Sequence, residues 1–176
     1  SSRRFAREPI PSGELSTLLE LSEGGIPADC LDRSGRPLSE VHLIVNAVDG
    51  LEPGTYLLRE EERGLELRNP GRFRNVAGAL ALGQDLAADA AVNVYLLADL
   101  DAVLGRFGDR GYRAAQLSAA IAAGNLYLAA YALRLGATGL TFFDDAVTDF
   151  LLPRAPGRGV MFLLALGRSA RRGADA

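Results

Sequence analysis

The sequence has no lysine, one cysteine and one histidine, and these shortages exclude several kinds of chemistry. All 19 of its permanently basic residues are arginine. Neither a lysine Schiff base nor a lysine general base is therefore available. With Cys30 as the single cysteine, there is no disulfide within the chain and no Cys/His metal cluster, and we predict no metal site. A catalytic Ser-His-Asp triad or Cys-His pair would have to use His42 as its histidine. The apolar run 41–48 around it is typical of a strand, and we interpret it as a strand histidine.

Composition and charge indicate a soluble globular protein that binds no nucleic acid. The chain is 48% hydrophobic and 23% charged, and its net charge of -3 gives no basic footprint. Its first residues, SSRRF, are polar and basic with no apolar run behind them, so we expect no signal peptide and a cytoplasmic location. The missing initiator methionine predicts that upstream residues were removed or belong to a longer protein. Arginine without lysine favours a bacterial source.

The chain is organised around the alanine-rich stretch 111–136, which carries no charge over residues 114–133. Alanine is the best helix former, and we predict a helix over 113–135 with Gly136 as its C-cap. A helix that is apolar nearly all round either spans a membrane or lies buried in a sizeable domain. We favour the buried helix, because alanine contributes little lipid affinity and polar residues such as Asn125 are spread through its middle. The small residues also suit close helix–helix or subunit packing.

The rest of the sequence predicts short helices and strands in irregular alternation. Helical patterns occupy 12–22, 76–86, 99–107 and 144–152, the last of them capped by Asp144. Strand patterns occupy 41–48, 90–98, 160–166 and a hairpin of 55–59 with 64–68. We place loops at 23–37, 69–74 and 153–159. This pattern predicts a single α+β domain over 1–176, with a mostly antiparallel sheet packed around the long central helix.

Both ends of the chain are rich in arginine. Arg3 and Arg4 stand beside Ser1 and Ser2, and Arg168 follows the last predicted strand. Arginine forks bind phosphate through two parallel hydrogen bonds, and serine hydroxyls complete such a site. If the two ends meet in space they form an anion pocket; if they do not, these arginines are simply solvated.

Several motifs, taken in order, resemble the nitroreductase superfamily. Ser1, Arg3 and Phe5 match the end of its N-terminal Arg-x-Ser-x-Arg/Lys-x-Phe motif, and a short helix follows. Further motifs are similar to the SagB-type branch, which includes the azoline dehydrogenases of peptide natural-product clusters. They lie at 38–42, 48–56, 106–113, 123–130, 143–145 and 166–168.

The resemblance implies a nitroreductase-like fold and an FMN-dependent oxidoreductase that acts on a small-molecule or peptide-derived substrate. It implies a homodimer in which the central helix packs at the interface and FMN binds between the subunits. Ser1, Arg3 and Arg168 match the positions that hold the FMN phosphate, and the loop 139–142 matches the one that lies against the isoalloxazine ring. The full cofactor-binding set that it implies is Ser1, Arg3, Ser34, Gly35, Asn125, Gly139, Leu140, Thr141 and Arg168.

The sequence departs from the branch at several positions. Azoline dehydrogenases of this branch use a Lys-Tyr pair for proton abstraction, and Arg106-Phe107 stands in its place. Arginine stays protonated and phenylalanine has no proton to give, so this pair cannot do that chemistry. In the loop 30–37 only Ser34-Gly35 corresponds to the family's Pro-Ser-x-Gly. Two functions stay open: an active FMN-dependent oxidoreductase, or a catalytically degenerate domain that serves as a dimerisation or scaffold partner in a biosynthetic complex.

Overall fold

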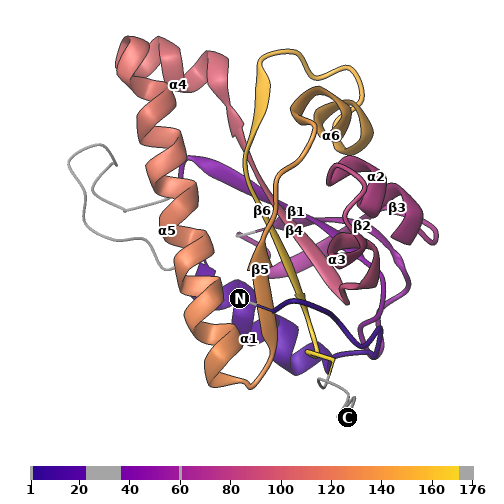
Figure 1. Cartoon of the computed structure of the whole chain (residues 1–176). Coiled ribbons are helices and arrows are strands. Elements are labelled where there is room, and N and C mark those ends of the chain that lie inside the picture. Colours follow the sequence, from indigo (N-terminus) through magenta and orange to yellow (C-terminus); the bar gives the residue numbers. More distant parts are fainter. Residues whose placement is uncertain (1, 23–36, 60, 171–176) are drawn as a thin grey trace.

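A computed structural model describes residues 2–22, 37–59 and 61–170 of the chain, and a six-stranded antiparallel sheet lies at its centre (Figure 1). The strand order is β3-β2-β1-β4-β6-β5, and every neighbouring pair is antiparallel. This confirms the predicted α+β fold with an antiparallel sheet and a long helix. The strands are β1 (Ser39–Val45), β2 (Gly54–Arg59), β3 (Gly64–Pro70), β4 (Val92–Asp99), β5 (Gly136–Gly139) and β6 (Arg158–Gly167).

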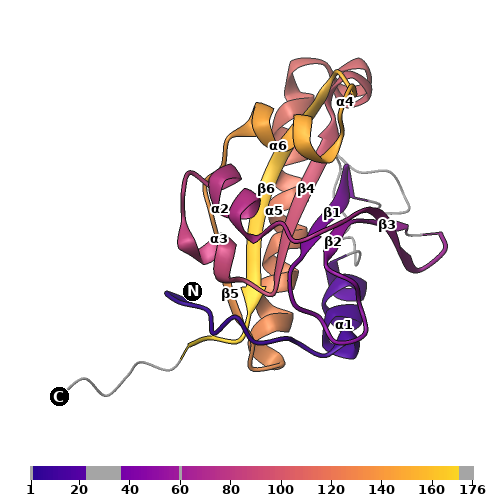
Figure 2. The ribbon, with the colours of Figure 1, turned by 90° about the vertical axis from the view of Figure 1, so that its right-hand side faces the viewer.

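Helices cover both faces of this sheet (Figures 1 and 2). One face packs against α1 (Ser12–Ser22) and α5 (Gly111–Ala132), and the other against α2 (Arg74–Leu80), α3 (Asp85–Asp89) and α6 (Asp144–Leu151). The connection from β4 to α5 is made by α4 (Leu100–Phe107) and the 3-10 turn η1 (Gly108–Arg110). Along β1, Leu43 and Val45 join the α5 side of the core while Ile44 joins the other, as the two-residue period of a strand requires.

The helix α5 buries a face of small residues against the sheet. Ala115, Ala119 and Ala123 are almost completely buried there. In the part of the chain that the structure describes, no helix has the length and apolarity needed to cross a bilayer. The prediction of Gly136 as the C-cap is wrong, because α5 ends at Ala132 and Gly136 begins β5.

The structure departs from the sequence predictions in four further places. The helix predicted over 76–86 is two helices, because Leu82 (φ 59°) and Gly83 (φ 75°) are left-handed and end α2 before α3 begins. The strand β5 was not predicted, and β3 continues into the predicted loop 69–74 as far as Pro70. Asp144 does not cap α6; its Oδ1 accepts a hydrogen bond from Val160 N at 2.9 Å and so ties α6 to β6.

Candidate functional site

The two ends of the chain meet beside the end of β6. The N–H of Ala6 donates to the carbonyl oxygen of Arg168 at 2.9 Å, and the N–H of Ala170 donates to that of Arg4 at 3.0 Å. These reciprocal bonds pair the segment after β6 with the N-terminal segment. The hypothesis that the two ends meet is therefore confirmed for these residues, whereas Ser1, Arg171 and Arg172 lie outside the described part of the chain.

Two serines from these two segments lie together over the start of β5. Their hydroxyl oxygens, Ser2 Oγ and Ser169 Oγ, are 2.7 Å apart, and Ser2 N donates to the carbonyl oxygen of Ala137 at 3.0 Å. A Cβ on Gly136 would overlap both Ser2 Oγ and Ser169 Oγ. Glycine is therefore required at this position so that both hydroxyls can approach the backbone of β5.

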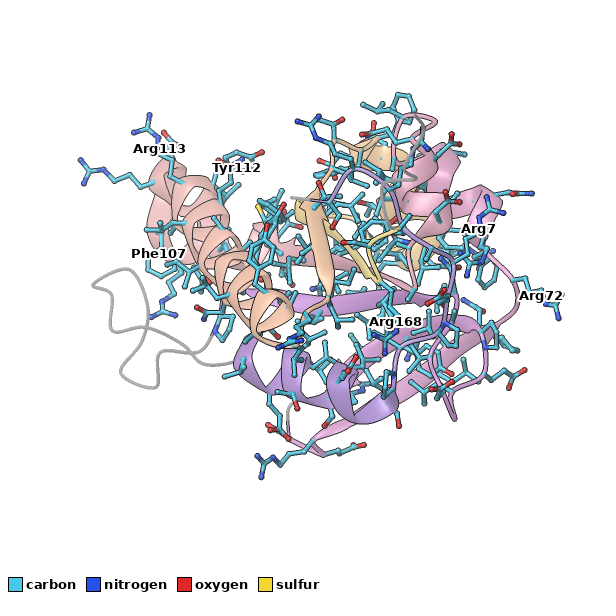
Figure 3. All side chains as sticks on the ribbon, turned by 60° about the horizontal axis from the view of Figure 1, so that its bottom comes forward. Arg7, Arg72, Phe107, Tyr112, Arg113 and Arg168 are labelled. Carbon is cyan, nitrogen blue, oxygen red and sulfur yellow. The ribbon has the colours of Figure 1, made fainter. Side chains whose placement is uncertain are left out.

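Arg3 and Arg168, which are next to these serines in sequence, carry donors that the fold leaves largely unused. The Arg168 side chain is 40% exposed, and its ion pair with Glu14 of α1 is long, with 4.0 Å between Nη2 and Oε2. Arg3 is exposed on the N-terminal segment. Figure 3 shows Arg168 well apart from Phe107 and Tyr112, which lie on the opposite side of the picture near the start of α5. A half-exposed guanidinium with so long an ion pair can bind an anion.

At the other end of β5, the chain turns into a loop whose first residues are tied to α5 and β6. The N–H of Gly139 donates to the hydroxyl oxygen of Tyr127 in α5. The N–H of Leu140 donates to the carbonyl oxygen of Leu163 in β6 at 3.1 Å. Both amide protons are thus used within the protein.

The following residues of this loop are held from the opposite face of the sheet. Gln84 Nε2, just before α3, donates to the carbonyl and hydroxyl oxygens of Thr141, both at 3.2 Å. The N–H of Phe143 donates to the carbonyl oxygen of Leu80 at 2.9 Å. Among the described residues, no hydrogen bond engages the N–H of Thr141 or of Phe142. A firmly held loop therefore presents two adjacent amide donors.

These two places lie at opposite ends of one short strand. Gly136 and Gly139 are three residues apart, which is about 10 Å in a strand.

Of the remaining predicted residues, Asn125 is half-buried in α5, two positions before Tyr127. Ser34 and Gly35 lie outside the described residues. Sequence reasoning missed Gln84 as an anchor of the loop, since its partner is 57 positions away.

A second charged cluster lies at the opposite end of β6. The Glu40 carboxylate contacts two partners: its Oε2 is 3.3 Å from His42 Nε2, and its Oε1 is 3.1 Å from Arg158 Nη1. The other nitrogen of this guanidinium, Arg158 Nη2, is 3.4 Å from Asp99 Oδ2. The hydrogen bond with His42 and the charge of Arg158 lower the pKa of Glu40 to about 2, although partial burial opposes the shift. His42 is 2% exposed in β1, which confirms the strand histidine. Glu40 and Arg158 line a cavity of about 530 Å³, but there they neutralise each other.

The sequence matches the nitroreductase family over residues 1–168. The chain belongs to the nitroreductase family. Over 157 residues it is 26% identical to the "Putative nitroreductase MJ1384" of Methanocaldococcus jannaschii, a match that covers 86% of this chain and 79% of that protein.

Solved structures of the same fold agree with this assignment. A "putative nitroreductase" from Anabaena variabilis is 31% identical with a TM-score of 0.85, over 97% of this chain. This chain spans only 36% of the length of the Anabaena protein. The same fold occurs in a chain of the Escherichia coli microcin synthetase McbBCD complex, whose structure has truncated pro-MccB17 bound. The two chains are 15% identical, with a TM-score of 0.81. The match covers 97% of this chain and 69% of that chain. At that identity the likeness concerns the fold alone.

Proposed function

We propose that this nitroreductase-family chain binds FMN along β5 and works as an FMN-dependent oxidoreductase. The observation that carries the proposal is the joining of the two arginine-bearing ends beside β5, through the hydrogen bonds of Ala6 with Arg168 and of Ala170 with Arg4. This arrangement is what the N-terminal motif requires if its arginine and the arginine after the last strand are to share one phosphate.

The described residues fit the phosphate of FMN. Arg3 and Arg168 supply guanidinium donors from the two joined segments, and Ser2 and Ser169 of the same segments bring two hydroxyls together. The pair between Arg168 and Glu14 is long enough that a doubly charged phosphate competes for the guanidinium. We assign the phosphate to Arg3 and Arg168, and to Ser1 by its place in the motif.

The loop after β5 fits the isoalloxazine ring. Gly139, Leu140 and Thr141 form a surface that three neighbouring elements hold in place, and the N–H groups of Thr141 and Phe142 are left to donate to ring acceptor atoms. A bound flavin supplies the hydride chemistry, while the chain positions the ring and tunes its electronics through such hydrogen bonds. We assign Asn125, Ser34 and Gly35 to the same cofactor on the family pattern.

We also propose a homodimer that uses the outer face of α5. Leu117 and Leu128 lie on one side of this helix and are 51% and 70% exposed. Large apolar side chains at helical spacing on a surface are typical of an interface. A second copy packed there would bring two cofactor sites to one interface.

The substrate that we propose is a small molecule or a peptide-derived compound, in a bacterial cytoplasm. The fold shared with a chain of the McbBCD complex and the SagB-type motifs favour the peptide-derived class. A second function, a catalytically degenerate scaffold or dimerisation partner, is favoured by one observation. The guanidinium of Arg106 stacks on the ring of Phe107 at 4.6 Å, so the expected Lys-Tyr position offers no base.

One experiment separates these two functions. The purified protein is mixed with FMN, desalted, and its visible absorption spectrum is recorded. Flavin bands that remain with the protein in stoichiometric amount support the oxidoreductase and justify a substrate screen. A colourless protein supports the degenerate domain and directs the search to protein partners.

A further inference from the structure

Tyr127 joins the central helix to the loop that follows β5. Its hydroxyl oxygen accepts the hydrogen bond that the N–H of Gly139 donates. The packing around Gly139 is close, because a Cβ there would lie 3.2 Å from the ring of Phe162 and 3.5 Å from the Tyr127 hydroxyl. The phenol therefore fixes the point at which the chain leaves β5 and enters the loop.

The same hydroxyl has a proton that the fold does not use. A phenol both accepts and donates, and within the described residues its proton has no acceptor. Tyr127 is only half-buried, and the bond from Gly139 places its O–H beside the loop. A donor whose oxygen already accepts a hydrogen bond is polarised by it and donates more strongly.

Tyr131, one turn further along α5, provides the comparison. The two rings contact each other, with centroids 6.2 Å apart, but Tyr131 is 52% exposed and no hydrogen bond to its hydroxyl is found among the described residues. The two tyrosines thus lie on the same helix with their rings in contact, but only the hydroxyl of Tyr127 binds Gly139.

We propose that Tyr127 is a ligand-contacting residue of this site, which holds Gly139 through its oxygen and donates its phenol proton to an acceptor atom of the bound isoalloxazine ring. This rests on the FMN site proposed above. A donor at the ring stabilises the electron-rich reduced flavin more than the oxidised flavin, so Tyr127 raises the reduction potential as well as the affinity.

The test compares Tyr127→Phe with the matched control Tyr131→Phe, because each removes one hydroxyl and keeps the ring. FMN dissociation constants and midpoint potentials of the bound flavin are measured for both. Tyr127→Phe is expected to weaken FMN binding about threefold to tenfold and to lower the potential, while Tyr131→Phe changes neither. A Tyr127→Phe variant with the potential and affinity of the wild type would overturn the contact with the ligand.

A second measurement separates this proposal from the FMN site itself. Amide hydrogen exchange at Gly139 is followed in the protein without added flavin, where Tyr127→Phe is expected to accelerate exchange and Tyr131→Phe is not. Unchanged exchange overturns the anchoring of the loop. If the wild type binds no FMN, the proposed function and the ligand contact both fail, and the exchange rates still decide the anchoring.

Discussion

The N–H of Ala6 donates to the carbonyl oxygen of Arg168 at 2.9 Å and joins two residues that are 162 positions apart in the sequence. With the bond from Ala170 to Arg4, it forms a short clasp that closes the N-terminal segment onto the end of β6. Because neither segment forms a named helix or strand there, this clasp is what sets the separation of Arg3 and Arg168. The cofactor site that we propose depends on it.

Gly136→Ala is expected to loosen this clasp. The new methyl group would overlap Ser2 Oγ and Ser169 Oγ, so both hydroxyls have to leave their places beside β5. Such overpacking costs about 1–3 kcal/mol of stability, and FMN binding should weaken with it. Gly105→Ala in α4 is the control, since its methyl group would meet nothing within 4 Å. Urea denaturation and FMN titration of both variants check this, and an unaffected Gly136→Ala protein would refute the close approach.

Charging the two sides of α5 should have different outcomes. Ala122 is 4% exposed and belongs to the core, so Ala122→Glu buries an unpaired carboxylate and is expected to unfold the domain. Leu128 is 70% exposed, so Leu128→Glu should leave the fold intact and dissociate the proposed dimer. Circular dichroism and light scattering after size exclusion report the two properties. A folded dimeric Leu128→Glu protein would show that the outer face of α5 is not the interface.

The stability of the fold should depend on Glu40 in a pH-dependent way. Its pKa is lowered from 4.5 to about 2 in the folded state, so its contribution is present above pH 4.5 and is lost as the pH falls toward 2. Because the carboxylate is half-exposed, Glu40→Gln should cost only about 1 kcal/mol at pH 7. The difference in unfolding free energy between wild type and variant, followed by urea denaturation, should shrink steadily below pH 4.5. A difference that stays constant down to pH 3 would argue against the interactions of Glu40 with His42 and Arg158.

Local sequence signals predicted much of this fold. Alanine content and the absence of charge predicted α5, the turn residues predicted the hairpin of β2 and β3, and the arginines at both ends suggested a joint site. Each of these depends on neighbours in sequence or on a simple charge argument. His42 was recognised as a strand residue from the apolar run around it.

What the sequence could not predict depends on contacts between distant residues. β5 is four residues long with glycine at both ends, and only its pairing with β6 makes it a strand. Gly136 has the pattern of a helix C-cap, yet the need for it comes from Ser2 and Ser169. The anchors of the following loop, Gln84 and Tyr127, have no signature because each is defined by the backbone that it binds.

The most direct test of the central claim compares the binding of FMN with that of riboflavin, which has the same ring system and no phosphate. The wild type is expected to bind FMN more tightly. Arg3→Ala and Arg168→Ala should each weaken FMN binding by about 1.5–3 kcal/mol and leave riboflavin nearly unchanged. Arg72→Ala, an exposed arginine that lies apart from Arg168 in Figure 3, should keep the wild-type preference. Equal affinities for the two flavins in the wild type, or a preference that survives both substitutions, would contradict a phosphate site at the joined ends.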